Sequence, residues 1–426
     1  MTSREYFDLL DGIKGGQSYF ITGPAGTGKT HLMKAIYNSL KNDGEKIVLT
    51  STTGSNALNL GGVTIHKLTG ISIHTNKAYI GFMKTSFLYS GIKKRMQNID
   101  IIVIDEVSML RSDQFELIDE LLKQVSGNQK PFGGKTLIFT GDFYQIPPVV
   151  RSWEKNKTQW LFDCQAWKDA NIKNICLTKI HRQLDSRFSN FLNDIRVGIW
   201  KPEDKEIVKE CESREVSDDS TTFFSTNEEC EIRNKKKMDE LPGEEKTYIA
   251  KVTGKRNKKY AHEKEAIVKD VIAKYELHLK VGADVIVVAN DVNSRYANGT
   301  QGVVQELGEK YVIIKTNDDK LLRITPFVWK KVDIKNKVLA KFEQIPLLLS
   351  YALTIHKAQG MTLEKAVVDC KNIFACGQLY VAVSRVKKLE NLKMLNFHEK
   401  QIMVSKDVTD FYARLERQMR NKSETF

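Results

Sequence analysis

This sequence of 426 residues lacks several features that would assign it to a membrane or a metal. No apolar run approaches the roughly 20 residues that span a bilayer, so we expect no membrane partner. The N-terminal stretch MTSREYFDLLDGIK is acidic and lacks the basic segment and apolar core of a secretory signal. The six cysteines contain no CxxC pair, which predicts reduced thiols and no zinc site.

The charge balance is basic. Lysine and arginine number 66 against 53 aspartates and glutamates, which gives a formal net charge of +13. This surplus fits a polyanionic partner such as nucleic acid, and it also fits a soluble basic protein. The length allows about two to four domains.

The clearest motif is GPAGTGKT at residues 23–30, between the apolar run SYFIT and a helical pattern. It matches GxxxxGK[ST], in which glycines let backbone N–H groups surround phosphate oxygens at a helix N-terminus. We expect Lys29 to reach the β- and γ-phosphates of ATP and the Thr30 hydroxyl to bind Mg²⁺. A plain glycine-rich turn does not explain Lys-Thr at this offset. The predicted nucleotide-binding residues are Gly23, Pro24, Ala25, Gly26, Thr27, Gly28, Lys29 and Thr30.

An acidic pair ends the apolar run IDIIVIDE at residues 99–106. The run predicts a buried parallel strand that delivers both acids to the ligand-binding edge of the sheet. Asp105 would hold Mg²⁺ and Glu106 would polarise the attacking water. The alternative is a helix cap, for which Ser112 or Asp113 is better placed.

A third strand is predicted in KTLIFTGD at residues 135–142, followed by FYQIPPVV. Two prolines forbid a helix directly after it. Gln145 is therefore placed to sense the γ-phosphate or the attacking water. Without the other motifs, the same glutamine fits a surface turn.

Taken together, these segments resemble a superfamily 1 helicase. More narrowly, the chain resembles the petite-integration-frequency (Pif) helicases, which are related to RecD and Dda. PFGG followed by GDFYQIPPV is specific to the Pif branch. The match is ordered and covers nearly the whole chain, through GPAGTGKT (23–30), TSTTGSNALNLGGVTIHKLTGI (50–71), IDEVSML (104–110), PFGGKTLIFTGDFYQIPPV (131–149), LTKIHRQLDSRFSNFLNDIRVG (177–198), ANGTQGVV (297–304), LSYALTIHKAQGMTLEKAVVD (349–369) and GQLYVAVSRVKKLENL (377–392).

The resemblance implies an ATP-dependent DNA helicase that moves 5′ to 3′ on single-stranded DNA. It would unwind duplex, forked or G-quadruplex DNA and serve DNA repair and telomere maintenance. The expected fold is α/β, with two RecA-like P-loop NTPase motor domains built on parallel sheets. We expect a monomer, or a dimer on DNA. The location would be intracellular: cytoplasmic and nucleoid-associated in a prokaryote or virus, and nuclear or mitochondrial in a eukaryote.

The resemblance also assigns residues to the nucleotide from the second domain. Arg182 in HRQ and Arg385 in VSR match arginines that meet the γ-phosphate, and Gly360 is assigned to nucleotide binding. An arginine delivered to that charge is worth ~10³–10⁵ in rate. On spacing alone, both arginines fit surface ion pairs. One departure is the missing upstream glutamine that reads adenine, because Gln17 lies too close to the first strand.

The predicted DNA contacts form two groups. Small polar residues at a strand end and the segment VTIHKL form the first, and TIHKAQG forms the second. The repeated TIHK indicates equivalent positions on two related domains, although a lone histidine is more often a packed core residue. The predicted DNA-binding residues are Thr52, Thr53, Gly54, His66, Lys67, Thr354, His356 and Lys357.

The expected domains span residues 1–175 and 176–426. Residues 72–98 are either a strand-separating wedge or a small satellite core. Residues 283–329 alternate apolar and polar residues with turn signals, which predicts a small antiparallel β-barrel of the SH3-like type. The insertion is expected to span residues 280–345, and the resemblance places it over the DNA. Residues 231–265 are dense in charge and are expected to be an exposed connection.

Two other functions fit the same motifs. One is a DNA-stimulated ATPase or translocase that remodels strands without efficient unwinding. The other is a nucleotide-gated DNA clamp that does not cycle. The hydrolytic residues Glu106, Arg182 and Arg385 argue against a clamp, because binding alone does not need them.

Overall fold

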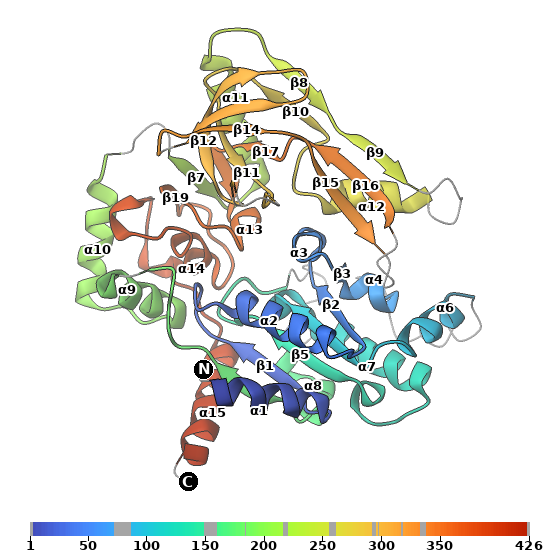
Figure 1. Cartoon of the computed structure of the whole chain (residues 1–426). Coiled ribbons are helices and arrows are strands. Elements are labelled where there is room, and N and C mark those ends of the chain that lie inside the picture. The colour runs from blue at the N-terminus through green and yellow to red at the C-terminus, as the bar shows by residue number, and fades with distance from the viewer. Residues whose placement is uncertain are drawn as a thin grey trace. The chain divides into compact units, whose positions relative to one another are not determined.

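The computed structural model describes residues 3–71, 87–148, 160–183, 185–215, 220–254, 261–291, 295–296, 298–316, 318–332 and 338–423. The chain forms two compact units (Figure 1). Unit 1 comprises Met1–His181, Val332–Lys337 and Ser405–Phe426, and unit 2 comprises Arg182–Lys331 and Val338–Val404. Within the described ranges, no helix has the length and apolar character needed to cross a membrane.

Unit 1 is built on a parallel sheet of six strands in the order β3-β2-β4-β5-β1-β6. The three central strands β4, β5 and β1 are buried along their whole length, as expected for a sheet covered on both faces. The three predicted strands are therefore confirmed. The strands are β1 (Tyr19–Thr22), β2 (Ile47–Ser51), β3 (Val63–Thr64), β4 (Ile101–Asp105), β5 (Thr136–Thr140) and β6 (Lys173–Cys176).

Alternating side chains of this sheet pack against different helices, because successive residues of a strand point to opposite faces. Ile21 and Ile138 join the apolar stripes of α1 and α2. Phe20 and Phe139 instead meet the ring of Trp167 on α8. The helices of unit 1 are α1 (Ser3–Lys14), α2 (Lys29–Asn42), α3 (Gly54–Leu60), α4 (Ile65–Thr69), α6 (Phe87–Met96), α7 (Ser112–Ser126), α8 (Gln165–Asp169) and α15 (Lys406–Ser423).

The C-terminal helix α15 belongs to unit 1 and not, as predicted, to the second domain. Its Phe411 ring stacks on Phe162 with 4.2 Å between centroids. The first boundary also differs, since it follows His181 and not residue 175. The reason is that the amide of Leu177 donates to Thr22 O at 2.8 Å, which extends the pairing of β6 beside β1.

Unit 2 contains a parallel sheet of four strands in the order β18-β7-β19-β20. Parallel sheets in both units agree with the expected α/β class. The strands are β7 (Thr221–Phe224), β18 (Ala352–Thr354), β19 (Ala366–Asp369) and β20 (Leu392–Leu395). The accompanying helices are α9 (Ser186–Val197), α10 (Pro202–Ser213), α11 (Asn227–Glu240), α13 (Ile355–Ala358) and α14 (Gln378–Val383).

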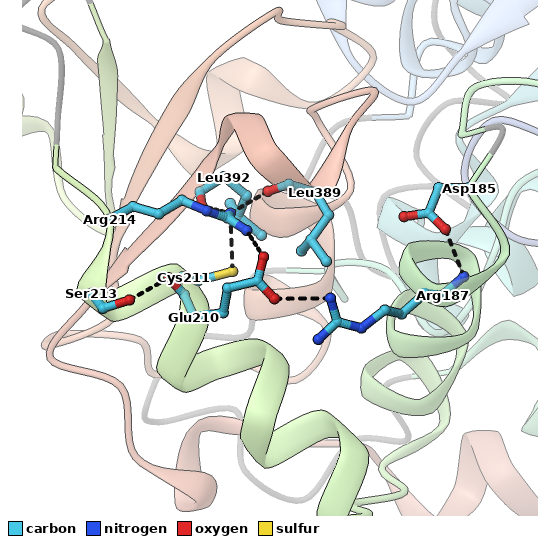
Figure 2. Close-up of polar contacts among 8 residues, drawn as sticks. All are labelled: Asp185, Arg187, Glu210, Cys211, Ser213, Arg214, Leu389 and Leu392. Carbon is cyan, nitrogen blue, oxygen red and sulfur yellow. Dashed lines mark hydrogen bonds and ion pairs between the residues drawn. The ribbon is translucent and has the colours of Figure 1, made fainter.

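A chain of charged side chains holds α9 and α10 in unit 2. Figure 2 shows Arg214, just after α10, donating to the carbonyl oxygens of Leu389 and Leu392 and to the Glu210 carboxylate. Glu210 also accepts from Arg187 on α9 at 2.8 Å. One guanidinium therefore fixes the end of α10 beside β20.

Unit 2 also contains a wholly antiparallel sheet in the order β14-β13-β12-β11-β17. The antiparallel strands predicted between residues 283 and 329 are present, and the SH3-like barrel remains a prediction. Two smaller sheets, β15-β16-β9 and β10-β8, accompany it. The bounds are β8 (Lys246–Ile249), β9 (Lys251–Gly254), β10 (Glu276–Leu279), β11 (Asp284–Val287), β12 (Gln301–Leu307), β13 (Val312–Thr316), β14 (Leu321–Ile324), β15 (Phe327–Val332), β16 (Val338–Gln344) and β17 (Leu347–Leu349).

The described part of residues 231–265 is largely exposed, as expected, but it is not a mere connection. Most of α11, the strands β8 and β9, and the start of α12 (Ala261–Asp270) lie in this segment. Helix α11 begins at a capping box in which Thr226 and Glu229 satisfy each other's backbone N–H groups. It buries few apolar side chains, so its charge hid the helical pattern.

Candidate functional site

The phosphate loop joins the end of β1 to the start of α2. Gly23 has φ +146°, and a Cβ there would overlap the carbonyl oxygen of Leu177, so only glycine fits. Gly28 precedes α2 in the left-handed conformation, with φ +85°. These two glycines bring the backbone round to the helix N-terminus, where N–H groups attract anions.

Side chains within the loop hold its own backbone. The Thr27 hydroxyl donates to Pro24 O at 2.9 Å. The Lys29 ammonium donates to the carbonyl oxygens of Gly23 and Pro24, at 2.8 and 2.9 Å. Thr30 lies exposed on the first turn of α2. The lysine and the threonine therefore begin the helix as the motif predicts.

Asp105 is the last residue of β4 and is only 4% exposed. One carboxylate oxygen accepts from the Thr140 hydroxyl at the end of β5. The other accepts from the Asn56 amide on α3 at 3.1 Å. Both donors are neutral, so they orient the carboxylate without neutralising its charge.

Glu106 has a strained backbone. Its φ of +54° is left-handed, which costs a residue with a Cβ about 1–3 kcal/mol and is common at functional sites. The Thr52 hydroxyl holds this conformation by donating to Glu106 O at 2.9 Å. Glu106 makes no side-chain cap to the following 3₁₀ turn, and α7 starts after Arg111, which also makes none. The helix-cap alternative is therefore wrong, as is the expected cap by Ser112 or Asp113.

Gln145 lies in the turn after β5, where its backbone N–H donates to Asp142 O at 2.9 Å. Its side chain is 6% exposed, so the surface-turn alternative is wrong. Strands β4, β5 and β1 are neighbours in the parallel sheet. Their carboxyl ends therefore place the acidic pair, Gln145 and the phosphate loop on one edge.

Within unit 2, Arg182 and its neighbour Gln183 hydrogen-bond to the backbone on either side of Arg385. Arg182 donates to Ser384 O at 3.0 Å, and Gln183 donates to Val386 O at 2.8 Å. Burial lowers the pKa of the Arg182 guanidinium from its ordinary value. Sequence reasoning identified the arginine but missed its glutamine partner.

Arg385 is 2% exposed and donates to its own unit. Its guanidinium bonds Val381 O and the Ser384 hydroxyl at 2.7 Å each, and Met361 O at 3.4 Å. The surface ion-pair alternative is therefore wrong for Arg385. Gly360, with φ +81°, forms the turn just before Met361. A role of Arg385 or Gly360 at the nucleotide remains a prediction.

The two TIHK segments have the same local structure. Each begins on an edge strand, β3 in unit 1 and β18 in unit 2. Thr64 and Thr354 then cap short helices with φ/ψ of −70°/147° and −74°/145°. Their hydroxyls accept from the amides of Lys67 and Lys357, at 3.2 and 3.4 Å. The predicted equivalence is confirmed at this level.

The histidines of both segments are largely buried. Burial lowers the pKa of His66 and of His356, so both favour the neutral form at pH 7. His66 Nε2 lies 3.2 Å from Gln114 Oε1 on α7. Burial also lowers the pKa of the Lys357 ammonium. DNA contact by these side chains remains a prediction.

The first predicted DNA-binding group also supports the acidic pair. The Thr52 hydroxyl donates to Glu106 O, and Thr53 caps α3 by accepting from Asn56 N at 3.3 Å. The same Asn56 orients Asp105, a role that sequence reasoning missed although the residue stands two positions after Gly54. Thr140, which also orients Asp105, could have been found, because it is a polar residue at the carboxyl end of a predicted strand. Tyr412 on α15, which bonds Asp142, had no signal in the sequence.

Gln17 does not replace the missing adenine-reading glutamine. It precedes β1 at the amino end of the sheet, opposite the phosphate loop. Its side-chain amide donates to Ser18 O and Asn171 O, at 3.0 and 2.7 Å. Its observed contacts tie the loop before β6 to β1. The predicted wedge lies mostly in residues 72–86, outside the described residues, and α6 covers much of the remainder.

Comparison with known proteins gives a consistent result. The family model described as PIF1-like helicase matches residues 5–206. The human ATP-dependent DNA helicase PIF1 is 32% identical over 97% of this chain and 64% of its own length. The Psychrobacter ATP-dependent DNA helicase Pif1 is 31% identical over 92% of this chain and 67% of its own. The chain thus spans about two thirds of the length of these relatives.

Solved Pif1 structures match nearly the whole of this chain. The Pif1 helicase of Candida albicans is 30% identical, with a TM-score of 0.75, over 97% of this chain and 99% of that one. Bacteroides Pif1 with ADP-AlF4 is 26% identical, with a TM-score of 0.85, over 98% of both chains. Bacteroides Pif1 bound to ssDNA is 26% identical, with a TM-score of 0.64, over 100% of this chain and 98% of that one. This chain therefore belongs to the Pif1 helicase family.

Proposed function

We propose that this protein is an ATP-dependent DNA helicase that moves along single-stranded DNA and separates duplex or structured DNA. The observation that carries the proposal is the single sheet edge that presents the phosphate loop, Asp105, Glu106 and Gln145. The Psychrobacter and human relatives, 31% and 32% identical to this chain, are named ATP-dependent DNA helicases. Travel from 5′ to 3′ is proposed from the family resemblance.

The residues of the edge divide the work of hydrolysis. Lys29 and the loop N–H groups bind the phosphates, Glu106 orients and deprotonates the attacking water, and Gln145 senses the γ-phosphate. We assign Arg182 and Arg385 to the charge that develops on the γ-phosphate, with Gly360 beside the nucleotide.

Thr30 and Asp105 suit a magnesium ion. A hydroxyl and a carboxylate are the hard oxygen ligands that Mg²⁺ prefers, and Asn56 and Thr140 already orient the carboxylate. When bound, Mg²⁺ would neutralise phosphate charge.

The proposed partner is single-stranded DNA, together with forked duplex and G-quadruplex DNA. In support, each matched TIHK segment carries one lysine on the short helix that follows an edge strand of a parallel sheet, and a groove for single-stranded DNA uses basic side chains of this kind. We propose that the antiparallel sheet of unit 2 is an SH3-like domain over the DNA and that residues 72–98 include the wedge. A monomer is proposed, or a dimer on DNA. Repair and telomere roles, and a nucleoid, nuclear or mitochondrial location, follow from the family alone.

Strand separation tests the proposal. Two matched duplexes, one with a 5′ tail and one with a 3′ tail, are incubated with ATP and Mg²⁺ at low salt. We expect only the 5′-tailed duplex to open, and the Lys29→Ala variant to open neither. Opening of the 3′-tailed duplex alone would refute the direction.

The same assay separates the alternative. Unwinding must overcome ~1.4 kcal/mol of stacking per base-pair step. If neither duplex opens while single-stranded DNA still stimulates ATP hydrolysis, the protein is a translocase that remodels strands. The Glu106→Gln variant is expected to lose turnover while it still binds ATP and DNA, and turnover that survives would refute the assignment of the base.

A further inference from the structure

The hydroxyl of Tyr412 on α15 joins two loops that the nucleotide site uses. It lies 2.7 Å from the hydroxyl of Thr22, 3.1 Å from the amide nitrogen of Phe143 and 3.2 Å from Asp142 Oδ1. Thr22 and Asp142 are fully buried, and Tyr412 is 7% exposed. These contacts bring together residues about 270 to 390 positions apart in the chain.

Only one assignment of hydrogens satisfies all three contacts. A phenol has one hydrogen to donate and two lone pairs to accept with. The Phe143 amide can only donate and the Asp142 carboxylate can only accept. Tyr412 therefore donates to Asp142 and accepts from Phe143, and Thr22 must donate to Tyr412.

Both loops lead directly to residues of the proposed hydrolytic site. Thr22 ends β1, and the next residue is Gly23 of the phosphate loop. Asp142 and Phe143 begin the turn that carries Gln145, and the backbone N–H of Gln145 donates to Asp142 O. The Tyr412 hydroxyl thus links the two loops that follow the neighbouring strands β1 and β5.

The ring of Tyr412 is held independently of its hydroxyl. It stacks on Tyr144, one residue before Gln145, with 4.7 Å between centroids and 12° between planes. The adjacent Phe411 packs on Phe162 and Phe143. Removing only the oxygen of Tyr412 should therefore leave α15 in place.

Helix α15 is also the first part of unit 1 after the chain leaves unit 2 at Val404. Met403, one residue earlier, is anchored in unit 2 by accepting from Gly377 N at 3.0 Å. Helix α15 therefore follows unit 2 directly along the chain and contacts the two loops of unit 1 through Tyr412.

We propose that Tyr412 is a positioning residue for ATP hydrolysis, which sets Gln145 against the phosphate loop; this inference rests on the proposed function. Its hydroxyl supports the geometry needed in the transition state and contributes little to binding of the product ADP. A misplacement of ~1 Å at a reacting centre costs on the order of 100-fold in rate, so loss of one oxygen in the supporting shell predicts a smaller effect.

The test compares Tyr412→Phe with Tyr6→Phe. Tyr6 is a matched control because its hydroxyl also makes a long-range bond in unit 1, to Ser39 at 2.9 Å, away from both loops. The affinity for fluorescently labelled ADP is measured with Mg²⁺, with and without aluminium fluoride. The transition-state gain is the ratio of these affinities, and a partly unfolded sample changes the number of sites without changing this ratio.

We expect Tyr412→Phe to bind ADP within about twofold of wild type, to lose roughly tenfold of the transition-state gain, and to lose a similar factor in kcat. Tyr6→Phe should keep both. An unchanged gain in Tyr412→Phe would overturn the proposal, and so would an equal loss of ADP affinity, which indicates a general role in folding the site.

A second variant covers the case in which Tyr412→Phe does not fold. Thr22→Val removes one partner and keeps the branched shape that suits β1. On its own it should lose part of the same gain and keep ADP affinity within about twofold. Where Tyr412→Phe does fold, adding Thr22→Val to it should cost nothing further, because Thr22 acts through the Tyr412 hydroxyl. An unchanged gain or additive losses would refute the proposal. If wild type itself gains no affinity from aluminium fluoride, the proposed function fails, which is a separate result.

Discussion

Asp119 on α7 holds the PFGG turn, and we expect its removal to destabilise unit 1 selectively. Phe132 in this turn has φ +52°, is 1% exposed, and packs its ring 4.8 Å from that of Phe115. Asp119 Oδ1 accepts from the Phe132 amide at 2.7 Å, and Oδ2 accepts from Lys123 at 2.6 Å. One carboxylate thus supports a strained backbone before β5.

The magnitude follows from these two contacts. Asp119→Ala leaves the buried Phe132 amide without its acceptor, which costs about 1–3 kcal/mol. The lost pair with Lys123, four residues along the helix, adds ~0.3–0.5 kcal/mol. We expect the free energy of unfolding of unit 1 to fall by roughly 1.3–3.5 kcal/mol.

Hydrogen exchange in β4 and β5 measures this loss in unit 1 alone. At 1.4 kcal/mol for each factor of ten, these central strands should exchange about 10- to 300-fold faster in Asp119→Ala. Lys123→Met is the matched control, since it removes the ion pair and keeps the Phe132 bond, and it should accelerate exchange only about twofold. If the two variants exchange equally fast, the hydrogen bond from the Phe132 amide to Asp119 is not what stabilises the turn.

Three further outcomes are expected. Asn56→Ala removes a donor to Asp105 and should raise the Mg²⁺ concentration for half-maximal turnover by roughly tenfold, and an unchanged Mg²⁺ titration would contradict this. Gly23→Ala places a Cβ on Leu177 O and should abolish binding of labelled ADP, whereas retained binding would contradict the loop geometry. Burial lowers the pKa of His66, so the unfolded chain takes up its proton first as pH falls through the ordinary value of 6.5, and stability present above that pH is lost below it. The urea midpoint should therefore change less between pH 7.5 and 5.5 in His66→Asn, and an equal change would refute the role of burial.

The nucleotide edge could be predicted because each of its parts is local. The phosphate loop carries its own glycines, and the left-handed Gly28 stands where the motif places it. Asp105 and Glu106 follow an apolar strand, and the parallel order of the sheet then brings them beside Gln145. A structural requirement that a few neighbouring residues meet, such as a glycine turn or an apolar strand, can be recognised in the sequence.

Long-range support could not be predicted in the same way. The apolar stripe of α15 indicates a helix but not which sheet it covers, and Tyr412 meets Thr22 across 390 positions. Assigning α15 to the second domain was one error of the prediction from sequence. Helix α11 was a second error, because few of its side chains are buried and charge dominates its sequence. Patterns of periodicity report burial, and they are weak where a helix is held by polar contacts.

The TIHK segment of unit 2 shows why the second error matters. Helix α11 carries Asn234, whose side-chain amide donates to Ala352 O and accepts from Ala352 N, both at 2.9 Å. This pair satisfies the backbone of the edge strand β18 two residues before Thr354, as a further strand would. A four-residue motif can therefore be recognised from its letters, whereas the contact that holds its strand comes from a stretch that composition alone assigns to solvent. Burial and polar satisfaction have to be read together to find residues that position a site without belonging to its motif.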